Sequence, residues 1–125
     1  MGRGNIETGR RGESIAAAFL KKKGYRILSR NLRTPFGELD IVARLGRHLV
    51  FIEVKTRNDD SLGPPSISIT WYKRESLVRN ALWYLAERGL AFELWRIDVV
   101  AVKLGRAGLA ERIDIIENAV VQDGY

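Results

Sequence analysis

The sequence contains no cysteine, which excludes disulfides, thiolate nucleophiles and cysteine-bound metal centres. It contains a single histidine, His48, so histidine-rich metal sites are excluded and a histidine-dependent triad would rest on that residue alone. The longest apolar runs, such as Val99–Val102, are far shorter than the ~20 residues that span a bilayer. The N-terminal arginines are not followed by an apolar segment, so no secretory signal is predicted. We therefore expect a cytoplasmic protein without a membrane partner, in which carboxylates and lysines carry any catalysis.

The chain has fewer acidic than basic residues. The 125 residues include 21 Lys and Arg against 15 Asp and Glu, which gives a net charge of +6 and a pI near 10. Such an excess favours polyanionic partners, with nucleic acid ahead of an anionic membrane surface. On charge alone, a merely basic surface without a specific partner explains the excess equally well.

The length and the hydrophobic periodicity predict one α/β domain covering residues 1–125. Two helices are predicted at 12–23 and 70–88, each followed by a glycine suited to a helix C-cap. Strand-like patterns occupy 25–33, 39–45, 48–56, 92–104 and 113–116. The resulting order, α-β-β-β-α-β-β, predicts a mixed β-sheet flanked by helices. Residues 1–11 are expected to form a basic tail, and residues 57–69, rich in Asn, Asp, Ser, Gly and Pro, a flexible loop.

The stretch FIEVKTR carries an acid and a base in a run that otherwise resembles a buried strand. Because side chains alternate along a strand, Val50, Ile52 and Val54 share one wholly apolar face. Glu53 and Lys55 share the opposite face with apolar residues that precede them. The charged pair therefore lies at one end of a largely buried surface.

Asp40 interrupts a second buried run, and a turn at Gly46-Arg47 would bring it opposite Glu53. Two carboxylates held close together repel each other, and a hard divalent ion such as Mg²⁺ relieves that repulsion. Lys55 could then orient or deprotonate a water molecule, or stabilise the charge that develops as a phosphodiester is attacked. The alternative is that Lys55 only neutralises Glu53 or Asp40 in an ion pair between strands, and the pattern favours neither interpretation.

The spacing D-x(12)-E-x-K, formed by Asp40, Glu53 and Lys55, resembles the active-site signature of the PD-(D/E)XK nuclease superfamily, which includes restriction endonucleases and archaeal Holliday-junction resolvases. A wider resemblance is carried by GESIAAAFLKKKGYRILSRNLRTPFGELDIVAR and LVFIEVKTR. These strings are similar to the uncharacterised, endonuclease-like YraN family. The similarity runs from about Gly12 to Lys73, continues in WRIDVVAV, and so covers most of the chain.

The resemblance implies a restriction-endonuclease-like core that binds Mg²⁺ or Mn²⁺. It implies that Asp40 and Glu53 are metal ligands, that Lys55 is the catalytic lysine, and that Glu13 is the acid contributed by the first helix. From its spacing, Glu13 borders the helix face that packs on the sheet. Its alternative role is that of a first-turn acid favoured by the helix dipole, and spacing alone favours that simpler role.

Several basic residues are candidates for contacts with a nucleic-acid backbone. Lys73 is expected in the first turn of the second helix, where a phosphate would offset its unfavourable interaction with the helix dipole, although simple solvation is a slightly better explanation. The full set of expected nucleic-acid contacts is Lys73, Arg57, Arg10, Arg11 and Arg74.

The leading hypothesis from the sequence is a divalent-metal-dependent endonuclease that hydrolyses phosphodiester bonds of DNA, including branched or structured DNA. One alternative is a non-catalytic nucleic-acid-binding protein that retains the nuclease fold. Another is a protein-interaction module whose basic surface meets an acidic partner. The sequence leaves open whether the chain forms a homodimer.

Overall fold

The computed structural model describes residues 3–57 and 71–119, which form a five-stranded mixed sheet with two α-helices. The elements are α1 (Arg3–Lys22), β1 (Arg26–Thr34), β2 (Gly37–Leu45), β3 (His48–Arg57), α2 (Trp71–Glu87), β4 (Leu94–Leu104), a short 3-10 turn η1 (Arg106–Gly108) and β5 (Ala110–Ile116). The predicted α/β class and the order α-β-β-β-α-β-β are confirmed. Among the residues described, no helix is long and apolar enough to cross a membrane.

The strands follow one another across the sheet in the order β1-β2-β3-β4-β5. Only β3 and β4 are parallel, and the connection between them contains α2. The other neighbouring pairs are antiparallel, including the predicted hairpin of β2 and β3, in which Leu45 pairs with His48. Gly46 adopts φ 58° in this turn, a conformation that glycine reaches without steric cost.

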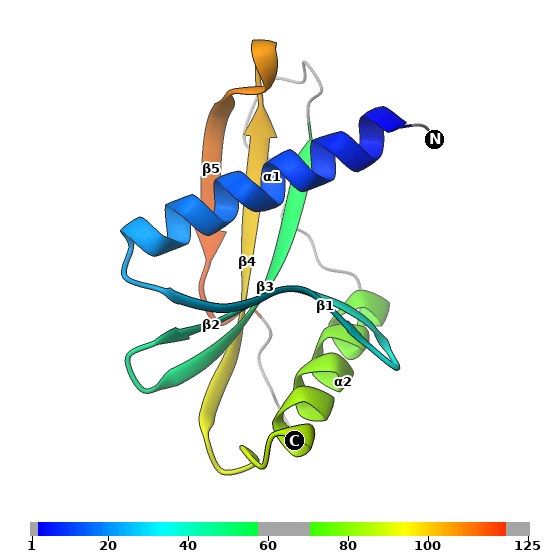
Figure 1. Cartoon of the computed structure of the whole chain (residues 1–125), viewed down its shortest axis with the longest axis vertical. Helices are drawn as coiled ribbons and strands as arrows, with labels where there is room; N and C mark the ends of the chain where they lie inside the picture. The colour runs from blue at the N-terminus through cyan, green and yellow to red at the C-terminus, as the bar shows by residue number, and fades with distance from the viewer. Residues whose placement is uncertain (1–2, 58–70, 120–125) are drawn as a thin grey trace.

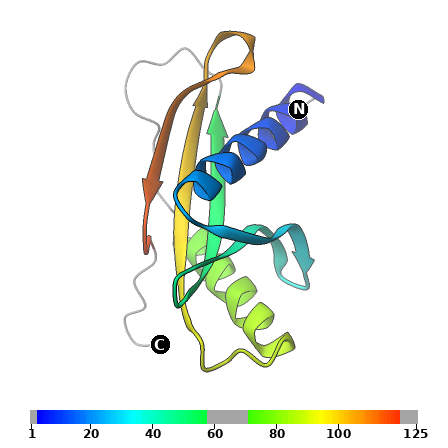
Figure 2. The same cartoon turned by 60° about the vertical axis from the view of Figure 1, so that its left-hand side comes forward.

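Each helix covers a different set of alternating side chains on β3. Val50 and Ile52 belong to the apolar cluster under α1, whereas Leu49 and Phe51 belong to the cluster under α2. In Figure 1, α1 crosses the upper part of β3, β4 and β5, and α2 lies beside the lower part of the sheet. The β1–β2 hairpin projects from the sheet between the two helices (Figure 2).

Helix α1 is longer than the periodicity predicts. The prediction of a basic tail through residue 11 is wrong for residues 3–11, because the helix begins at Arg3 rather than at Gly12. This segment contains glycine and few apolar residues, so it carries a weak helix signal of its own and extends a helix whose later turns pack on the sheet. Arg57, predicted as the first residue of a flexible loop, is instead the last residue of β3, and the rest of that prediction, residues 58–69, lies outside the described residues.

The tip of the β1–β2 hairpin is fixed to α2 by a buried amide. Asn80 is 2% exposed; its Oδ1 accepts a hydrogen bond from the Thr34 hydroxyl, and its Nδ2 donates to the Ser76 carbonyl over 2.8 Å. Gly37, with φ 142°, lies directly against this amide. The end of β1 is therefore tied to α2 by a hydrogen bond, and the start of β2 packs against the same amide.

A second polar network is centred on Asp98, which lies beside Ile52 in the middle of the sheet. Asp98 is fully buried and accepts hydrogen bonds from the Tyr25 hydroxyl (2.9 Å), from Arg96 Nε (3.0 Å) and from the Asn118 backbone N–H (2.8 Å). Burial and the adjacent Asp98 raise the pKa of Tyr25 to about 12. The network joins the residue before β1, the first half of β4 and the residues after β5, and it satisfies a carboxylate that would otherwise be costly to bury.

We expect Tyr25→Phe to lower the free energy of unfolding by ~1–2 kcal/mol, because it removes one donor from a buried carboxylate. Urea denaturation at pH 7 would measure the change. Arg112→Ala is the matched control, since it breaks an exposed pair with Asp114 and should change stability by less than ~1 kcal/mol. Equal effects of the two substitutions would contradict a stabilising role for the Asp98 network.

Candidate metal and phosphate site

The candidate site forms where β2 separates from β3. The described pairing between these strands ends at Ile41↔Ile52, one residue short of Asp40 and Glu53. At this point the Asp40 side chain replaces the backbone as acceptor, because its Oδ2 receives the Val54 backbone N–H over 2.8 Å. Asp40 is thus held at the opening of the hairpin, in the region where alternation predicts the acid pair.

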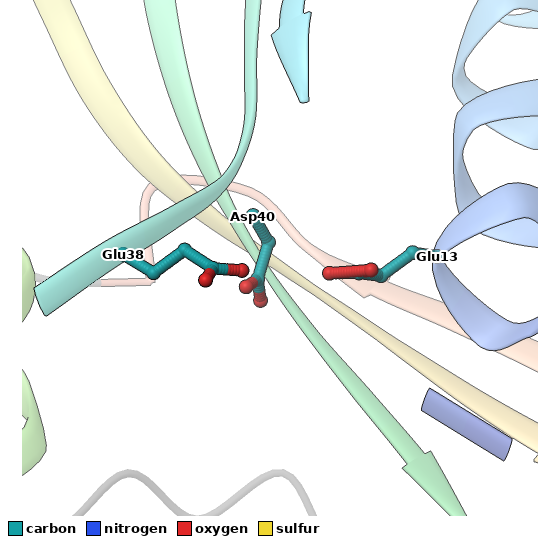
Figure 3. A group of neighbouring side chains, drawn as sticks. All are labelled: Glu13, Glu38 and Asp40. Atoms are coloured by element: carbon teal, nitrogen blue, oxygen red, sulfur yellow. The ribbon is translucent and has the colours of Figure 1, made fainter. Parts of the chain in front are cut away.

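Three carboxylates converge at this opening. Glu13 comes from α1, and Glu38 and Asp40 come from β2; one oxygen of each lies within 4.8 Å of an oxygen of the other two. Figure 3 shows the Glu13 and Glu38 carboxylates approaching Asp40 from opposite sides. Within the part of the chain that the structure describes, this is a group of acids with the spacing needed to hold a metal ion.

Glu53 borders the same cavity but has a different partner. Its Oε1 lies 3.1 Å from Lys73 Nζ on α2, and its side chain is 11% exposed. The Glu53 carboxyl also hydrogen-bonds with the Asp40 carboxyl, which favours the protonated form of Asp40 and contributes to its raised pKa. Lys73, expected as a phosphate contact or a solvated residue, is thus an ion-pair partner of one of the predicted metal ligands.

The crowding of acids shifts their protonation equilibria. Burial, followed by the charge of Glu53, raises the pKa of Asp40 to about 7, even though the Val54 N–H acts in the opposite direction. Burial and the charge of Glu38 also raise the pKa of Glu13, while Arg30 acts to lower it. The site therefore holds carboxyl groups that are poorly neutralised by their protein neighbours.

Asn31 contributes a donor to this group through an unusual backbone conformation. It adopts φ 53° within β1, and with its amide nitrogen facing the acids it donates to Glu13 Oε1 at 2.8 Å and to Glu38 Oε1 at 3.1 Å. Sequence reasoning did not identify Asn31 or Glu38 as site residues. The spacing E-x-D at Glu38 and Asp40 was an available signal, because residues two apart on a strand can share a face.

The acids line a cavity of about 790 Å³ that also contains basic and hydroxyl side chains. Its described walls are Ile6, Thr8, Gly9, Arg10, Glu13, Asn31, Arg33, Glu38, Asp40, Glu53, Val54, Thr56 and Arg57. The first turns of α1 form one of these walls, so the extension of this helix toward Arg3 directly shapes the cavity. Three arginines next to clustered carboxylates suit a ligand that carries phosphate and is bound together with a cation.

The structure brings some of the predicted residues together and separates others. Glu13, Asp40 and Glu53 meet at one cavity, and Arg10 and Arg57 line it. Lys55 is half-buried on β3, two residues beyond Glu53, and is not among the described lining residues. Its catalytic role stays a prediction.

Two of the predicted nucleic-acid contacts lie away from the cavity walls. Arg11 donates from Nη1 to the Gly108 carbonyl over 3.4 Å, next to the β4–β5 connection. Arg74 is exposed in the first turn of α2 and is not among the described lining residues.

By its fold and its site, this protein is a single-domain α/β protein with a cluster of carboxylates at the opening of the β2–β3 hairpin. Residues 12–102 match the family described as uncharacterised protein family UPF0102, and the chain belongs to that family. A UPF0102 protein of Moorella thermoacetica is 49% identical over 111 residues, which cover 89% of this chain and 92% of the relative. A UPF0102 protein of Syntrophotalea carbinolica is 46% identical over 120 residues, which cover 96% of each chain.

The raised pKa of Asp40 predicts an unusual pH dependence of stability. Because the pKa rises from 3.8 to about 7 on folding, the folded state binds more protons than the unfolded state between those values. The contribution of Asp40 to stability should be greatest below pH 4, should fall between about pH 4 and 7 by up to ~1.4 kcal/mol per pH unit, and should level off above about pH 7.

Asp40→Asn should remove this component, because an amide oxygen still accepts the Val54 N–H but carries no charge. Urea denaturation of both proteins in metal-free buffer from pH 4.5 to 8.5 would measure the difference, which should grow with pH in favour of the variant. A constant difference across this range would contradict the shifted pKa.

Proposed function

We propose that this protein is a divalent-metal-dependent nuclease that hydrolyses phosphodiester bonds of DNA, including branched or structured DNA. The observation that carries the proposal is the convergence of Glu13, Glu38 and Asp40, with oxygens within 4.8 Å of one another, in a cavity that also contains three arginines. A carboxylate cluster alone would suit many roles. Its combination with phosphate-binding side chains supports chemistry on a phosphoester.

The donor set fits a hard divalent ion. All three ligand atoms are carboxylate oxygens, the type that Mg²⁺ and Mn²⁺ prefer, and no softer ligand is present among them. Glu13, Glu38 and Asp40 would hold the ion, with Glu53 beside them. When bound, the ion would stabilise negative charge on the attacked phosphate and lower the pKa of a water molecule.

The protein side chains supply the remaining parts of the reaction. Arg10, Arg33 and Arg57 would bind nonbridging phosphate oxygens along the cavity wall and so align the phosphodiester with the acids. Lys55, which follows Glu53 on β3, would hold or accept the proton of the attacking water. Lys73 offsets the charge of Glu53 from α2 and keeps this carboxylate in a fixed place.

Purified protein should cleave DNA in the presence of Mg²⁺ or Mn²⁺, and EDTA should abolish the cleavage. Supercoiled plasmid and a synthetic four-way junction would serve as substrates. Asp40→Asn, Glu53→Gln and Lys55→Ala should each reduce the rate by ~100-fold or more, because each removes a group required for charge stabilisation or proton transfer.

Glu111→Gln is the control for these variants, because Glu111 is exposed on β5 and does not line the cavity. Cleavage that persists in Asp40→Asn at the wild-type rate would contradict the proposal and indicate a contaminating nuclease. Salt-dependent DNA binding that is insensitive to EDTA and never leads to cleavage would instead favour the alternative, a non-catalytic nucleic-acid-binding protein.

Two adjacent arginines test the orientation of DNA on the cavity. Arg10 lines the cavity, whereas Arg11 is bonded to Gly108, so Arg10→Gln should weaken DNA binding and lower the salt slope by about one unit. Arg11→Gln should have a smaller effect although it removes the same charge. Fluorescence anisotropy at several salt concentrations would measure both, and equal losses would show that only net charge matters.

A further inference from the structure

Helix α1 lies close against β3 at Gly12, the residue before Glu13. A Cβ atom at Gly12 would lie 1.8 Å from Thr56 Oγ1 and 2.7 Å from Thr56 Cβ, so no other residue fits there without moving the helix or the strand. One turn later, Ala16 continues the contact and is fully buried. Small side chains thus set the distance between α1 and β3.

The same short part of β3 fixes two of the acids. Val54 holds Asp40 through its backbone N–H, and Thr56, two residues further, lies under Gly12. Glu13 follows Gly12 directly, so the depth at which the helix seats on Thr56 determines how far the Glu13 carboxylate reaches toward Asp40. Thr56 itself lines the cavity.

We propose that Gly12 is a positioning residue for the metal site: its lack of a side chain lets α1 seat on Thr56 and brings Glu13 within ligand distance of Asp40. This inference rests on the proposed metal-dependent function. It does not give Gly12 any contact with the metal or the substrate.

Gly9 provides a matched control in the same helix. A Cβ at Gly9 would meet no atom within 4 Å. Alanine is favoured over glycine in a helix by ~1 kcal/mol, so Gly9→Ala should stabilise the protein, whereas Gly12→Ala should destabilise it despite the same gain in helix propensity. Opposite signs in urea denaturation would establish that the contact with Thr56 determines the effect.

Mn²⁺ binding to the full-length chain, followed by electron paramagnetic resonance, tests the positioning role. Gly12→Ala should weaken Mn²⁺ binding about 10- to 100-fold, the range found when supporting residues of a metal site are changed. Ala18→Ser, a change at an exposed position of the same helix that does not line the cavity, should leave Mn²⁺ binding unchanged. Thr56→Gly, which removes the surface on which α1 rests, should also weaken binding. The double variant Gly12→Ala with Thr56→Gly should bind more tightly than either single variant, because the added methyl group occupies the space that the threonine leaves.

The outcomes separate this inference from the proposed function. Wild-type protein that binds no Mn²⁺ would overturn the metal site and this inference together. Wild-type binding that is unchanged in Gly12→Ala, or a loss that the double variant does not recover, would overturn only the positioning role. If Gly12→Ala cannot be purified, Thr56→Gly and the double variant still decide the question, since recovery of binding in the double variant relative to Thr56→Gly supports the role and its absence overturns it.

Discussion

The hydrogen bond from the Val54 backbone N–H to the Asp40 carboxylate is the interaction on which the candidate site depends. It occurs where β2 leaves β3, and it satisfies a strand donor that the neighbouring backbone no longer reaches. Because a side chain takes over from the backbone here, the two strands can separate without leaving this N–H unpaired. The cavity lies at this separation, and Asp40 is one of its lining residues.

The fold tolerates the acid cluster because each carboxyl group has a nearby donor or cation. Asp40 has the Val54 N–H, Glu13 has Asn31 and Arg30, and Glu53 has Lys73. Despite these contacts, burial and then the charge of Glu53 raise the pKa of Asp40. A group of acids that folding brings together but leaves incompletely neutralised retains a strong electrostatic preference for an additional cation.

The strands and the closeness of Asp40 to Glu53 could be predicted from the sequence, because both follow from the alternation of apolar and polar residues. Asp40 and Glu53 interrupt apolar runs on consecutive strands, so a hairpin at Gly46 was enough to predict that they lie close together. Glu38 was missed although its spacing to Asp40 on β2 was an available signal. Asn31 was missed because its approach depends on its own left-handed conformation inside β1, which no hydrophobic pattern encodes. Likewise, the pairing of Lys73 with Glu53 depends on how α2 is placed after a long connection, and alternation along β3 carries no information about that placement.

Arg10 and Arg11 on α1 show that the positions of basic residues in the sequence do not predict which surface they reach. Arg10 and Arg11 are adjacent, but each helical residue is rotated by about 100° from the previous one. One therefore lines the cavity while the other reaches the β4–β5 connection. A net charge of +6 consequently does not indicate where a polyanion would bind. The placement of Arg10, Arg33 and Arg57 beside the acids indicates the cavity as the candidate surface.

The mixture of acids and arginines in one cavity has a thermodynamic consequence for the proposed nuclease. Without a cation, the carboxylates repel a phosphodiester that the arginines attract, so the two sets of side chains oppose each other. A divalent ion at the acids would remove the repulsion and leave the arginines free to act. Because linkage is reciprocal, a bound phosphodiester would tighten cation binding by the same factor. Binding of metal and of nucleic acid at this cavity would then be cooperative, without any change in fold.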